Sequence, residues 1–466
     1  MAREYDLVVI GSGPAGEKGA AQAAYFGKRV ALIEKETVLG GAAANTGTLP
    51  SKTLRETALY LSGFRQRGLY GVDFSLKREA RVQDFMFRER LVKDHERERI
   101  ARNLARHKVE LYRGEATFVD AHTVAVKPKG TPPVHLSAQV VLIATGSSPF
   151  RPPVFPFFDA DVYDSDTILN LSQLPASMAV IGGGVIGCEY ACMFAAIGVK
   201  VTLVEGRDAL MSFLDGEMSR TLRERMEAMD IAMKMPDSVE SVAVEPTTLV
   251  LGLKSGQSFS AECILVAAGR SGNTDGLNLE ALGIQVGKRG HVDVNEHYQT
   301  AVPHIYAAGD VIGFPALAST SMEQARIAMV HAFQLQYKTA LAPILPYGIY
   351  TIPELSMAGE TEESLQQKKI DYVAGRATYA NNARGQIIGD GGGLLKLLFR
   401  REDMRLLGVH MIGEQATELV HIGLTALMTQ ATAELFIQTC YNYPTLSEVY
   451  KYATYDALGK RNAPAA

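Results

Sequence analysis

Cysteine is scarce in this sequence, because only four occur among 466 residues: Cys188, Cys192, Cys263 and Cys440. Four scattered thiols cannot form the disulfide framework of a small secreted protein, so we expect a reducing compartment. Cys188 and Cys192 are four residues apart and share a helix face. They are either a redox pair or, as is more common, small core residues. No cysteine and histidine cluster has the spacing of a zinc site, so we expect no metal.

Long hydrophobic runs and excess charge are also missing. No segment reaches the ~18 uninterrupted apolar residues of a membrane span. The chain enters a strand-like run at residues 5–10 rather than a signal peptide, so we expect a cytoplasmic protein. A net charge of −4 excludes a bulk field that would attract nucleic acid or an anionic membrane. The 47% of hydrophobic residues excludes a disordered chain, and the length predicts about three domains of ~150 residues.

Charge is dense only in residues 77–108, where both signs occur. Apolar residues recur there at roughly helical spacing, namely Phe85, Leu91, Val92, Ile100 and Leu104. This pattern predicts an amphipathic helix with a solvated face. A nucleic-acid surface, the alternative, would need a stripe of one sign.

Glycine, in contrast, is abundant, with 43 residues, and its first cluster follows a strand-like apolar run at residues 6–10. The run leads into Gly11, Gly13 and Gly16, which permit a tight turn, close approach to a pyrophosphate and close helix–strand packing, respectively. A second predicted strand ends at Glu34, whose carboxylate can accept hydrogen bonds from a ribose. This complete βαβ context predicts a dinucleotide site rather than a glycine turn that merely packs.

The same unit recurs later in the chain. A predicted strand at residues 178–181 leads into Gly182, Gly184 and Gly187, and the next strand ends at Glu205. In both units the acid follows the first glycine at the same spacing, which argues against chance. One chain therefore binds two dinucleotides.

Glu205 also bears on which dinucleotide the second unit takes. Its carboxylate would accept hydrogen bonds from a ribose diol, which favours NAD(H), and it would repel a 2′-phosphate. Arg207 lies two residues further on and can pair with such a phosphate. Use of NADH alone and use of both nucleotides therefore stay open.

Three later strands end in small residues, at 144–146, at 267–269 and just before Asp310. With the two glycine units, and in this order, they make nearly the whole chain resemble the flavoprotein disulfide reductases, a family that includes dihydrolipoamide dehydrogenase. The resemblance implies FAD in the first unit and NAD(H) or NADP(H) in the second. It also implies that Asp310 holds the flavin ribitol, and that the turns with Gly146 and Gly269 connect the two domains.

A Gly-Gly step near residue 40 opens the segment that decides the chemistry. In the family, two redox cysteines lie on a helix after this step, shortly before a Pro-Ser-Lys sequence. Here Ala43 and Thr48 occupy those positions, and neither side chain can form a thiolate or a disulfide. Lys52 follows this helix. The resemblance implies that Lys52 pairs with Glu189 beside flavin N5, where a cation stabilises electron density on the reduced ring; a structural salt bridge is the alternative.

The C-terminal segment supports the same conclusion. The family carries a His-Pro dipeptide there, and this histidine and a glutamate five residues later protonate the departing thiol. Here Tyr443 replaces the histidine, whereas Glu448 is present. A phenol with a pKa near ~10 is a poor general base at neutral pH. Loss of both thiols and of their base indicates a protein that does not reduce disulfides.

Five segments resemble one branch of the family, the soluble pyridine nucleotide transhydrogenases: 47–52, 213–215, 269–274, 349–354 and 442–445. The resemblance implies an FAD-dependent NAD(P)H oxidoreductase without a dithiol, whose acceptor is NAD(P)+ itself. Alternatives are reduction of a quinone, a dye or dioxygen, and a non-enzymatic, flavin-stabilised redox-sensing dimer. The retained Lys52 and Glu189 count against the last.

The expected fold is α/β, with two Rossmann-like dinucleotide-binding domains and a C-terminal α+β dimerisation domain. The expected boundaries are 1–149 with 272–345 for FAD, 150–271 for NAD(P) and 346–466 for dimerisation. Within the last, we expect strands at 396–399 and 406–411, and helices at 414–429 and from Leu446. The resemblance implies a homodimer in which residues 443–448 lie over the partner's flavin.

The candidate site residues fall into two groups. The catalytic candidates are Lys52, Glu189, Tyr443 and Glu448. The candidates for binding FAD, NAD(H) and NADP(H) are Gly11, Gly13, Gly16, Glu34, Lys52, Gly146, Asp310, Gly182, Gly184, Gly187, Glu205, Arg207 and Gly269.

Overall fold

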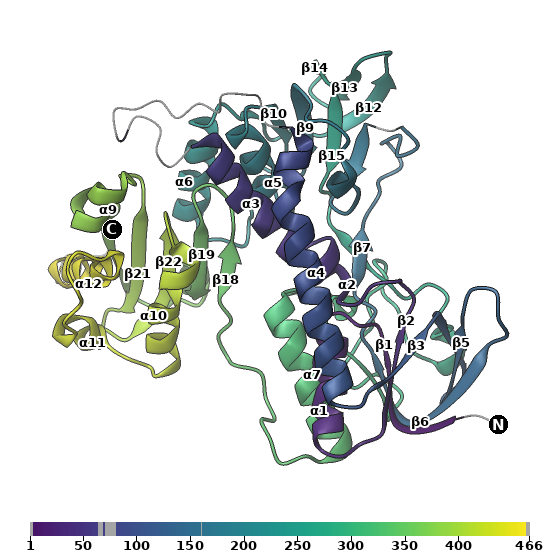
Figure 1. Ribbon diagram of the computed structural model, residues 1–466. Coiled ribbons are helices and arrows are strands. Elements are labelled where there is room, and N and C mark those ends of the chain that lie inside the picture. Colours follow the sequence, from purple (N-terminus) through teal and green to yellow (C-terminus); the bar gives the residue numbers. More distant parts are fainter. Residues whose placement is uncertain (1–2, 64–68, 70–80, 160, 463–466) are drawn as a thin grey trace.

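The computed structural model describes residues 3–63, 69, 81–159 and 161–462 (Figure 1). Three sheets of five or more strands, each accompanied by helices, confirm the predicted α/β class. Residues 77–80 of the predicted charged helix lie outside the described residues. Within the described part of the chain, no helix is both long enough and apolar enough to cross a membrane.

The first sheet contains the first glycine unit. Its strands follow the order β3-β2-β1-β6-β5-β4, with β17 paired to β6. They are β1 (Arg3–Ile10), β2 (Val30–Glu34), β3 (Glu110–Arg113), β4 (Glu115–Asp120), β5 (Thr123–Lys127), β6 (Val134–Ile143) and β17 (Ile305–Ala307). Alternate residues of β1 face opposite sides: Leu7 and Val9 pack towards helices α1 (Pro14–Tyr25) and α7 (Ala318–Phe333), whereas Val8 packs in the core of the other face.

The second sheet contains the second glycine unit. It is entirely parallel, in the order β11-β10-β9-β15-β8. Its strands are β8 (Val162–Asp164), β9 (Ser177–Ile181), β10 (Lys200–Val204), β11 (Ala232–Lys234) and β15 (Cys263–Val266), with helices η1 (Thr167–Asn170), α5 (Val185–Ala196) and α6 (Gly216–Glu227). A small antiparallel sheet adjoins it: β12 (Val239–Val244), β13 (Leu249–Leu253) and β14 (Ser258–Ala261).

Two short strands lie directly after the small-residue turns at 144–146 and 267–269. They are β7 (Ser147–Pro149) and β16 (Arg270–Gly272), and they pair antiparallel. The chain thus leaves the first sheet through β7 and returns towards it through β16, and these two strands form one ribbon. The return segment also contains η2 (Glu280–Leu282) and η3 (Asp310–Ile312).

The C-terminal sheet is antiparallel, in the order β18-β19-β22-β21-β20. Its strands are β18 (Tyr347–Ile349), β19 (Leu355–Gly359), β20 (Tyr372–Thr378), β21 (Leu394–Arg400) and β22 (Leu406–Ile412). Its helices are α8 (Glu362–Gln367), η4 (Tyr379–Asn381), α9 (Ala383–Ile388), α10 (Ala416–Met428), α11 (Ala433–Gln438), η5 (Leu446–Glu448) and α12 (Val449–Lys460). The predicted strands and helices of this region are confirmed, although α10 begins two residues late because Gln415 has a left-handed φ of +61°.

Helix α4 (Val82–Arg106) connects the cores of the two glycine units. Phe85 and Met86 pack into the core that contains α5, and Ile100 and Leu104 pack into the core of the first sheet. Figure 1 shows α4 as a long helix running beside α3 (Thr48–Ser62) through the middle of the molecule. The amphipathic interpretation of this charged segment is therefore confirmed at Phe85, Ile100 and Leu104, whereas Leu91 is exposed. Most of the charged side chains lie on the solvent side, but Glu89 is buried and pairs with Lys93 at 2.6 Å.

A buried ionic cluster joins α6 to the C-terminal sheet. Lys396 of β21 is 1% exposed, and its Nζ lies 2.8 Å from Asp215 Oδ1 and 2.9 Å from Glu217 Oε2. It also bonds to Glu362 of α8, while Arg376 of β20 pairs with Glu217 at 2.7 Å. The three carboxylates lie close enough together to ligate a metal ion, but the Lys396 ammonium already bonds all of them. The cluster therefore serves to fix the second sheet against the C-terminal sheet.

Candidate active site between the two glycine loops

The first glycine loop has the close contacts that only glycine tolerates. Gly11 has φ of +104°, and a Cβ placed on it would lie 2.3 Å from the Ala144 carbonyl oxygen. A Cβ on Gly16 would lie 1.9 Å from the Gly11 carbonyl oxygen. A Cβ placed on Gly13, in contrast, would meet no atom closer than Gly41 Cα, at 3.9 Å. The loop is therefore tightly packed on its protein side and open at Gly13, at the start of α1.

Glu34 closes the first loop from the end of β2. Its Oε2 accepts hydrogen bonds from Ser12 N at 3.0 Å and from Ser12 Oγ at 2.6 Å. Its Oε1 accepts one from Glu36 N at 2.9 Å. A carboxylate has about four lone-pair positions, so Glu34 keeps one acceptor position for a ribose hydroxyl.

The second glycine loop repeats this geometry. Gly182 has φ of +111°, and its Cβ would lie 2.5 Å from the Ala267 carbonyl oxygen. A Cβ on Gly187 would lie 1.8 Å from the Gly182 carbonyl oxygen, whereas Gly184 has open space around it. The structure thus brings the glycines of each unit together in the same arrangement.

Glu205 occupies the place in the second unit that Glu34 has in the first. Its Oε2 accepts a hydrogen bond from Gly183 N at 2.7 Å, and its Oε1 accepts one from Arg207 N at 2.9 Å. The Arg207 side chain adds bonds at 2.9 Å to Oε1 and 3.3 Å to Oε2. Burial alone would raise the pKa of Glu205, but these hydrogen bonds lower it below its ordinary value. Glu205 is therefore ionised at neutral pH.

Lys52 and Glu189 form an ion pair between the two units. Lys52 Nζ lies 2.7 Å from Glu189 Oε2 and 2.9 Å from Oε1, and the side chains are 28% and 4% exposed. Lys52 lies on α3, and Glu189 lies on α5, just after the second glycine loop. Tyr350 N donates to Glu189 Oε1 at 2.9 Å, and the Tyr350 ring lies 5.0 Å from the ammonium. The cation is thereby held in one place while it keeps an exposed side.

Asp310 begins η3, three residues after β17, and contacts the two-stranded ribbon. Ser147 Oγ donates to Asp310 Oδ2 at 2.9 Å, and Arg270 Nε donates to Ser147 Oγ at 2.8 Å. Thr145 and Gly146 come directly before Ser147 in the chain. The Thr145 hydroxyl is buried, and Thr145 Oγ1 has no hydrogen-bond partner among the described residues. A buried hydroxyl without a partner at a loop end is suited to a bound ligand.

The segment that contains Ala43, Thr48 and Lys52 forms two helices rather than the single helix that we predicted. We expected one helix to carry positions 43 and 48, with Lys52 after it. The structure instead has α2 (Gly41–Asn45) and a separate α3, in which Thr48 is the first residue and Lys52 lies in the second turn. Pro50 explains the break, because it has no N–H to donate and its ring would clash with the Thr46 carbonyl in a continuous helix.

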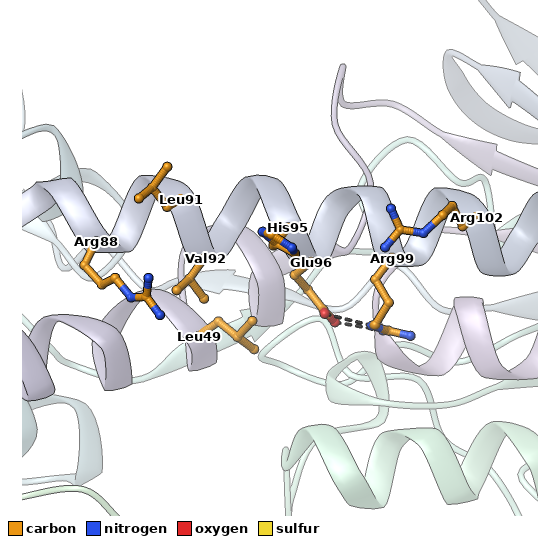
Figure 2. Close-up of a pocket in the computed structure, with 8 residues that line it drawn as sticks. All are labelled: Leu49, Arg88, Leu91, Val92, His95, Glu96, Arg99 and Arg102. Carbon is orange, nitrogen blue, oxygen red and sulfur yellow. Dashed lines mark hydrogen bonds and ion pairs between the residues drawn. The ribbon is translucent and has the colours of Figure 1, made fainter.

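A groove of about 520 Å³ lies along α4 beside the start of α3 (Figure 2). Figure 2 shows Leu49 of α3 facing Val92 of α4, with Arg88 at one end of the groove. Its lining combines apolar side chains with three arginines, of which Arg99 pairs with Glu96. The lining residues are Leu49, Arg88, Leu91, Val92, His95, Glu96, Arg99 and Arg102. Because Leu49 follows Thr48, the groove opens beside the position of a family thiol.

Tyr443 and Glu448 are not part of the bonded network around Lys52 in the described chain. The Tyr443 side chain is 75% exposed, and Glu448 ends the short helix η5. Among the described residues, neither side chain is bonded to Lys52 or Glu189. The exposed position of Tyr443 is compatible with a role in a second subunit's site.

Sequence reasoning missed three residues of the site: Tyr350, Ser147 and Arg270. Tyr350 fixes Glu189 through its backbone N–H, and Ser147 with Arg270 fixes Asp310. Tyr350 and Arg270 lie in the segments 349–354 and 269–274 that resemble one branch of the family, so a signal was present. Ser147 had no such signal, because a single serine after a glycine is common in loops.

The four cysteines do not form a redox pair. All are free, and Cys188, Cys192 and Cys263 are buried. Burial raises the pKa of Cys188 far above its ordinary value, and it raises those of Cys192 and Cys263 to about 12. These thiols stay protonated and unreactive at neutral pH, which confirms the interpretation of Cys188 and Cys192 as core residues.

We expect electron transfer from NADH to an acceptor to survive alkylation. Iodoacetamide added after reduction by NADH should modify only the exposed Cys440, because the other thiols are buried and protonated. Turnover should stay unchanged, and glutathione disulfide and dihydrolipoamide should not react. Mass spectrometry would locate the modified cysteine. Loss of turnover on alkylation of any of the four would show that a thiol takes part.

Family models match both parts of the chain. Residues 5–331 match the model described as pyridine nucleotide-disulphide oxidoreductase, and residues 345–454 match the dimerisation domain of the same family. The chain belongs to this family. These matches confirm the predicted resemblance to the flavoprotein disulfide reductases. They also confirm the expected dimerisation domain at the C-terminal side.

Curated relatives and solved structures agree with this membership. The soluble pyridine nucleotide transhydrogenase of Mycobacterium tuberculosis is 45% identical over 99% of this chain and 98% of its own length. That of Chromohalobacter salexigens is 40% identical over 98% of both. The HOCl-induced flavoprotein disulfide reductase RclA from Escherichia coli is similar, with a TM-score of 0.86 and 27% identity over 96% of this chain and 98% of its own. LpdA from Mycobacterium tuberculosis is similar, with a TM-score of 0.88 and 25% identity over 97% of this chain and 99% of its own.

Proposed function

We propose that this protein is an FAD-dependent pyridine nucleotide transhydrogenase, which passes hydride between NAD(H) and NADP(H). The observation that carries the proposal is the Lys52–Glu189 pair between two dinucleotide loops, next to a segment with Ala43 and Thr48 in place of thiols. Without those thiols, electrons cannot continue from this site to a disulfide. Relatives named soluble pyridine nucleotide transhydrogenase, at 45% and 40% identity, support the same activity.

The first glycine unit fits FAD. Gly13 leaves open backbone at the start of α1, Glu34 keeps an acceptor position, and the Thr145 hydroxyl is buried without a partner among the described residues. We assign the pyrophosphate to this loop, the adenosine ribose to Glu34 and the ribitol chain to Asp310. FAD, when bound, supplies a carrier that takes hydride from one nicotinamide and returns it to another.

The arrangement of the sheets supports the proposed domain boundaries. We assign residues 1–149 and 272–345, which supply the first sheet, to FAD binding. Residues 150–271 hold the second sheet and would bind NAD(P), and residues 346–466 hold the antiparallel sheet and would form the dimer contact.

Lys52 supplies a fixed positive charge. Its ammonium is held by both oxygens of the buried Glu189, and Glu189 is held in turn by the backbone N–H of Tyr350. A preorganised charge stabilises negative charge that develops during hydride arrival, and it needs no rearrangement at that moment. The same charge is present for both directions of transfer, as a transhydrogenase requires.

The second glycine unit would hold both nicotinamide nucleotides in turn. Gly182, Gly184 and Gly187 form the loop for the pyrophosphate, as Gly184 has open space around it. Glu205 and Arg207 together place a carboxylate and a guanidinium where the adenosine ribose or its 2′-phosphate would lie. Donor and acceptor would therefore use one site in ping-pong order.

The match to the family's dimerisation domain indicates a homodimer. We propose that Tyr443 and Glu448 approach the site of the partner subunit, because Tyr443 is exposed in its own chain and both residues lie in the part that matches the dimerisation domain. We also propose that the protein works in the cytoplasm, as the word "soluble" in the names of its relatives supports.

A second candidate function rests on the groove along α4. It opens beside Leu49, next to a position from which a family thiol is missing, and it holds about 520 Å³. An anionic quinone or dye could enter there and make the protein an acceptor reductase. The three arginines in its lining are the observation that favours this alternative.

A steady-state screen tests the proposal. NADH should reduce thio-NADP+ faster than it reduces quinones, dyes or dioxygen, and double-reciprocal plots should give the parallel lines of ping-pong kinetics. Quinone turnover without thio-NADP+ turnover would replace the proposal by the acceptor-reductase alternative. Negligible turnover with every acceptor would instead favour a redox-sensing dimer.

A further inference from the structure

The Glu205 carboxylate has every acceptor position filled by the protein itself. Gly183 N and Arg207 Nη2 donate to Oε2, at 2.7 and 3.3 Å. Arg207 N and Arg207 Nε donate to Oε1, both at 2.9 Å. Two oxygens offer about four lone-pair positions, so none is left for a ribose hydroxyl.

The first unit provides an internal comparison for this observation. There, Ser12 N corresponds to Gly183 N, and Glu36 N corresponds to Arg207 N. The Glu36 side chain adds no bond to Glu34, and one acceptor position remains. The third bond to Glu34 comes from Ser12 Oγ, which has no counterpart at Gly183. In the second unit, two bonds from the Arg207 guanidinium fill the two positions that the backbone bonds leave open.

The guanidinium is able to move, whereas the carboxylate is not. The Arg207 side chain is 55% exposed and that of Glu205 is 8% exposed. Arg207 Nη1 also donates to Ser212 Oγ at 2.9 Å, at the exposed end of the side chain. An ion pair with so exposed a partner is weak, so a ligand can displace it.

We infer that Arg207 is a movable counter-ion that blocks Glu205 in the empty site and lets one site accept either nucleotide. When NAD(H) binds, the ribose diol replaces the guanidinium on Glu205. When NADP(H) binds, the guanidinium leaves Glu205 and pairs with the 2′-phosphate, towards which the Ser212 hydroxyl can also donate. This inference rests on the proposed function, since it requires that both nucleotides use the second unit.

The inference predicts that one variant, Arg207→Ala, changes the affinities for NAD+ and NADP+ in opposite directions. Arg207→Ala frees two acceptor positions, so NAD+ should bind about two- to fivefold more tightly, as the loss of a weak competing pair implies. NADP+ should bind roughly tenfold to a hundredfold more weakly, because a charge-assisted contact to the phosphate is lost. Ser212→Ala should weaken NADP+ alone. A merely structural or purely electrostatic role of Arg207 would weaken both nucleotides together.

Isothermal titration of the oxidised holoenzyme with NAD+ and NADP+ measures these affinities without any hydride transfer. Arg223→Ala is the matched control, because it removes an exposed arginine paired with Glu227 on α6. In a Glu205→Ala background, the gain in NAD+ affinity on removing Arg207 should vanish. Equal or weaker NAD+ binding in Arg207→Ala, with a normal control, overturns the inference. Loss of transhydrogenation with intact opposite shifts would overturn the proposed function alone.

Discussion

Lys52→Met is expected to lower the rate at which NADH reduces the bound FAD by roughly 100-fold, as loss of one preorganised electrostatic group does elsewhere. The variant removes the ammonium that Glu189 holds at 2.7 Å between the two glycine loops. FAD content should stay unchanged, since the bonds of this side chain among the described residues go to Glu189 and Ser51 and not to the first glycine loop. The flavin potential should fall, because negative charge on the reduced form loses its counter-charge. Stopped-flow absorbance and a redox titration measure the two effects.

Controls separate this role from a structural one. Lys52→Met leaves the buried Glu189 carboxylate without its cation, which alone can destabilise the fold. The double variant Lys52→Met/Glu189→Gln removes that charge as well and should be equally slow. Lys368→Met, which breaks an exposed pair with Glu360, should leave the rate unchanged. A normal rate of flavin reduction in the double variant would reduce the pair to a structural salt bridge.

Gly187→Val should abolish tight binding of NADH while FAD stays bound. Its Cβ would lie 1.8 Å from the Gly182 carbonyl oxygen, so α5 must move away from the second loop. Overpacking of this kind costs about 1–3 kcal/mol, and the KM for NADH should rise roughly tenfold to a hundredfold. FAD content is measured by absorbance after denaturation, and KM by steady-state kinetics.

Two further glycine variants make this result specific. Gly16→Val should have the converse effect and release FAD, because its Cβ would lie 1.9 Å from the Gly11 carbonyl oxygen. Gly459→Ala should leave both nucleotides bound, since its Cβ would meet nothing within 4 Å. An unchanged KM for NADH in Gly187→Val would mean that the nicotinamide nucleotide binds outside the second unit.

The two glycine units could be predicted from sequence because each glycine answers a local steric demand. Gly11 and Gly182 need positive φ, and Gly16 and Gly187 need the absence of a Cβ, within one continuous βαβ segment. The buried state of Cys188 was predictable for the same reason, as its helix follows the loop.

Contacts between distant segments could not be predicted in this way. The bonds of Lys396 to Asp215 and of Tyr350 N to Glu189 join residues more than a hundred positions apart, and no local pattern encodes such a pairing. The break between α2 and α3 was missed although Pro50 is visible in the sequence, because the resemblance to the family's thiol helix outweighed it. The filled acceptor positions of Glu205 required the rotamer of Arg207, which sequence does not give.

The central claim is that reduced enzyme returns its electrons to a nicotinamide nucleotide. A double-mixing stopped-flow experiment tests it most directly. The holoenzyme is first reduced without oxygen by one equivalent of NADH and is then mixed with thio-NADP+, a quinone or aerated buffer. The account predicts that thio-NADP+ restores the oxidised flavin absorbance within one turnover time, and that dioxygen does so slowly. Flavin that stays reduced with thio-NADP+ but is rapidly reoxidised by the quinone or by air would contradict the account.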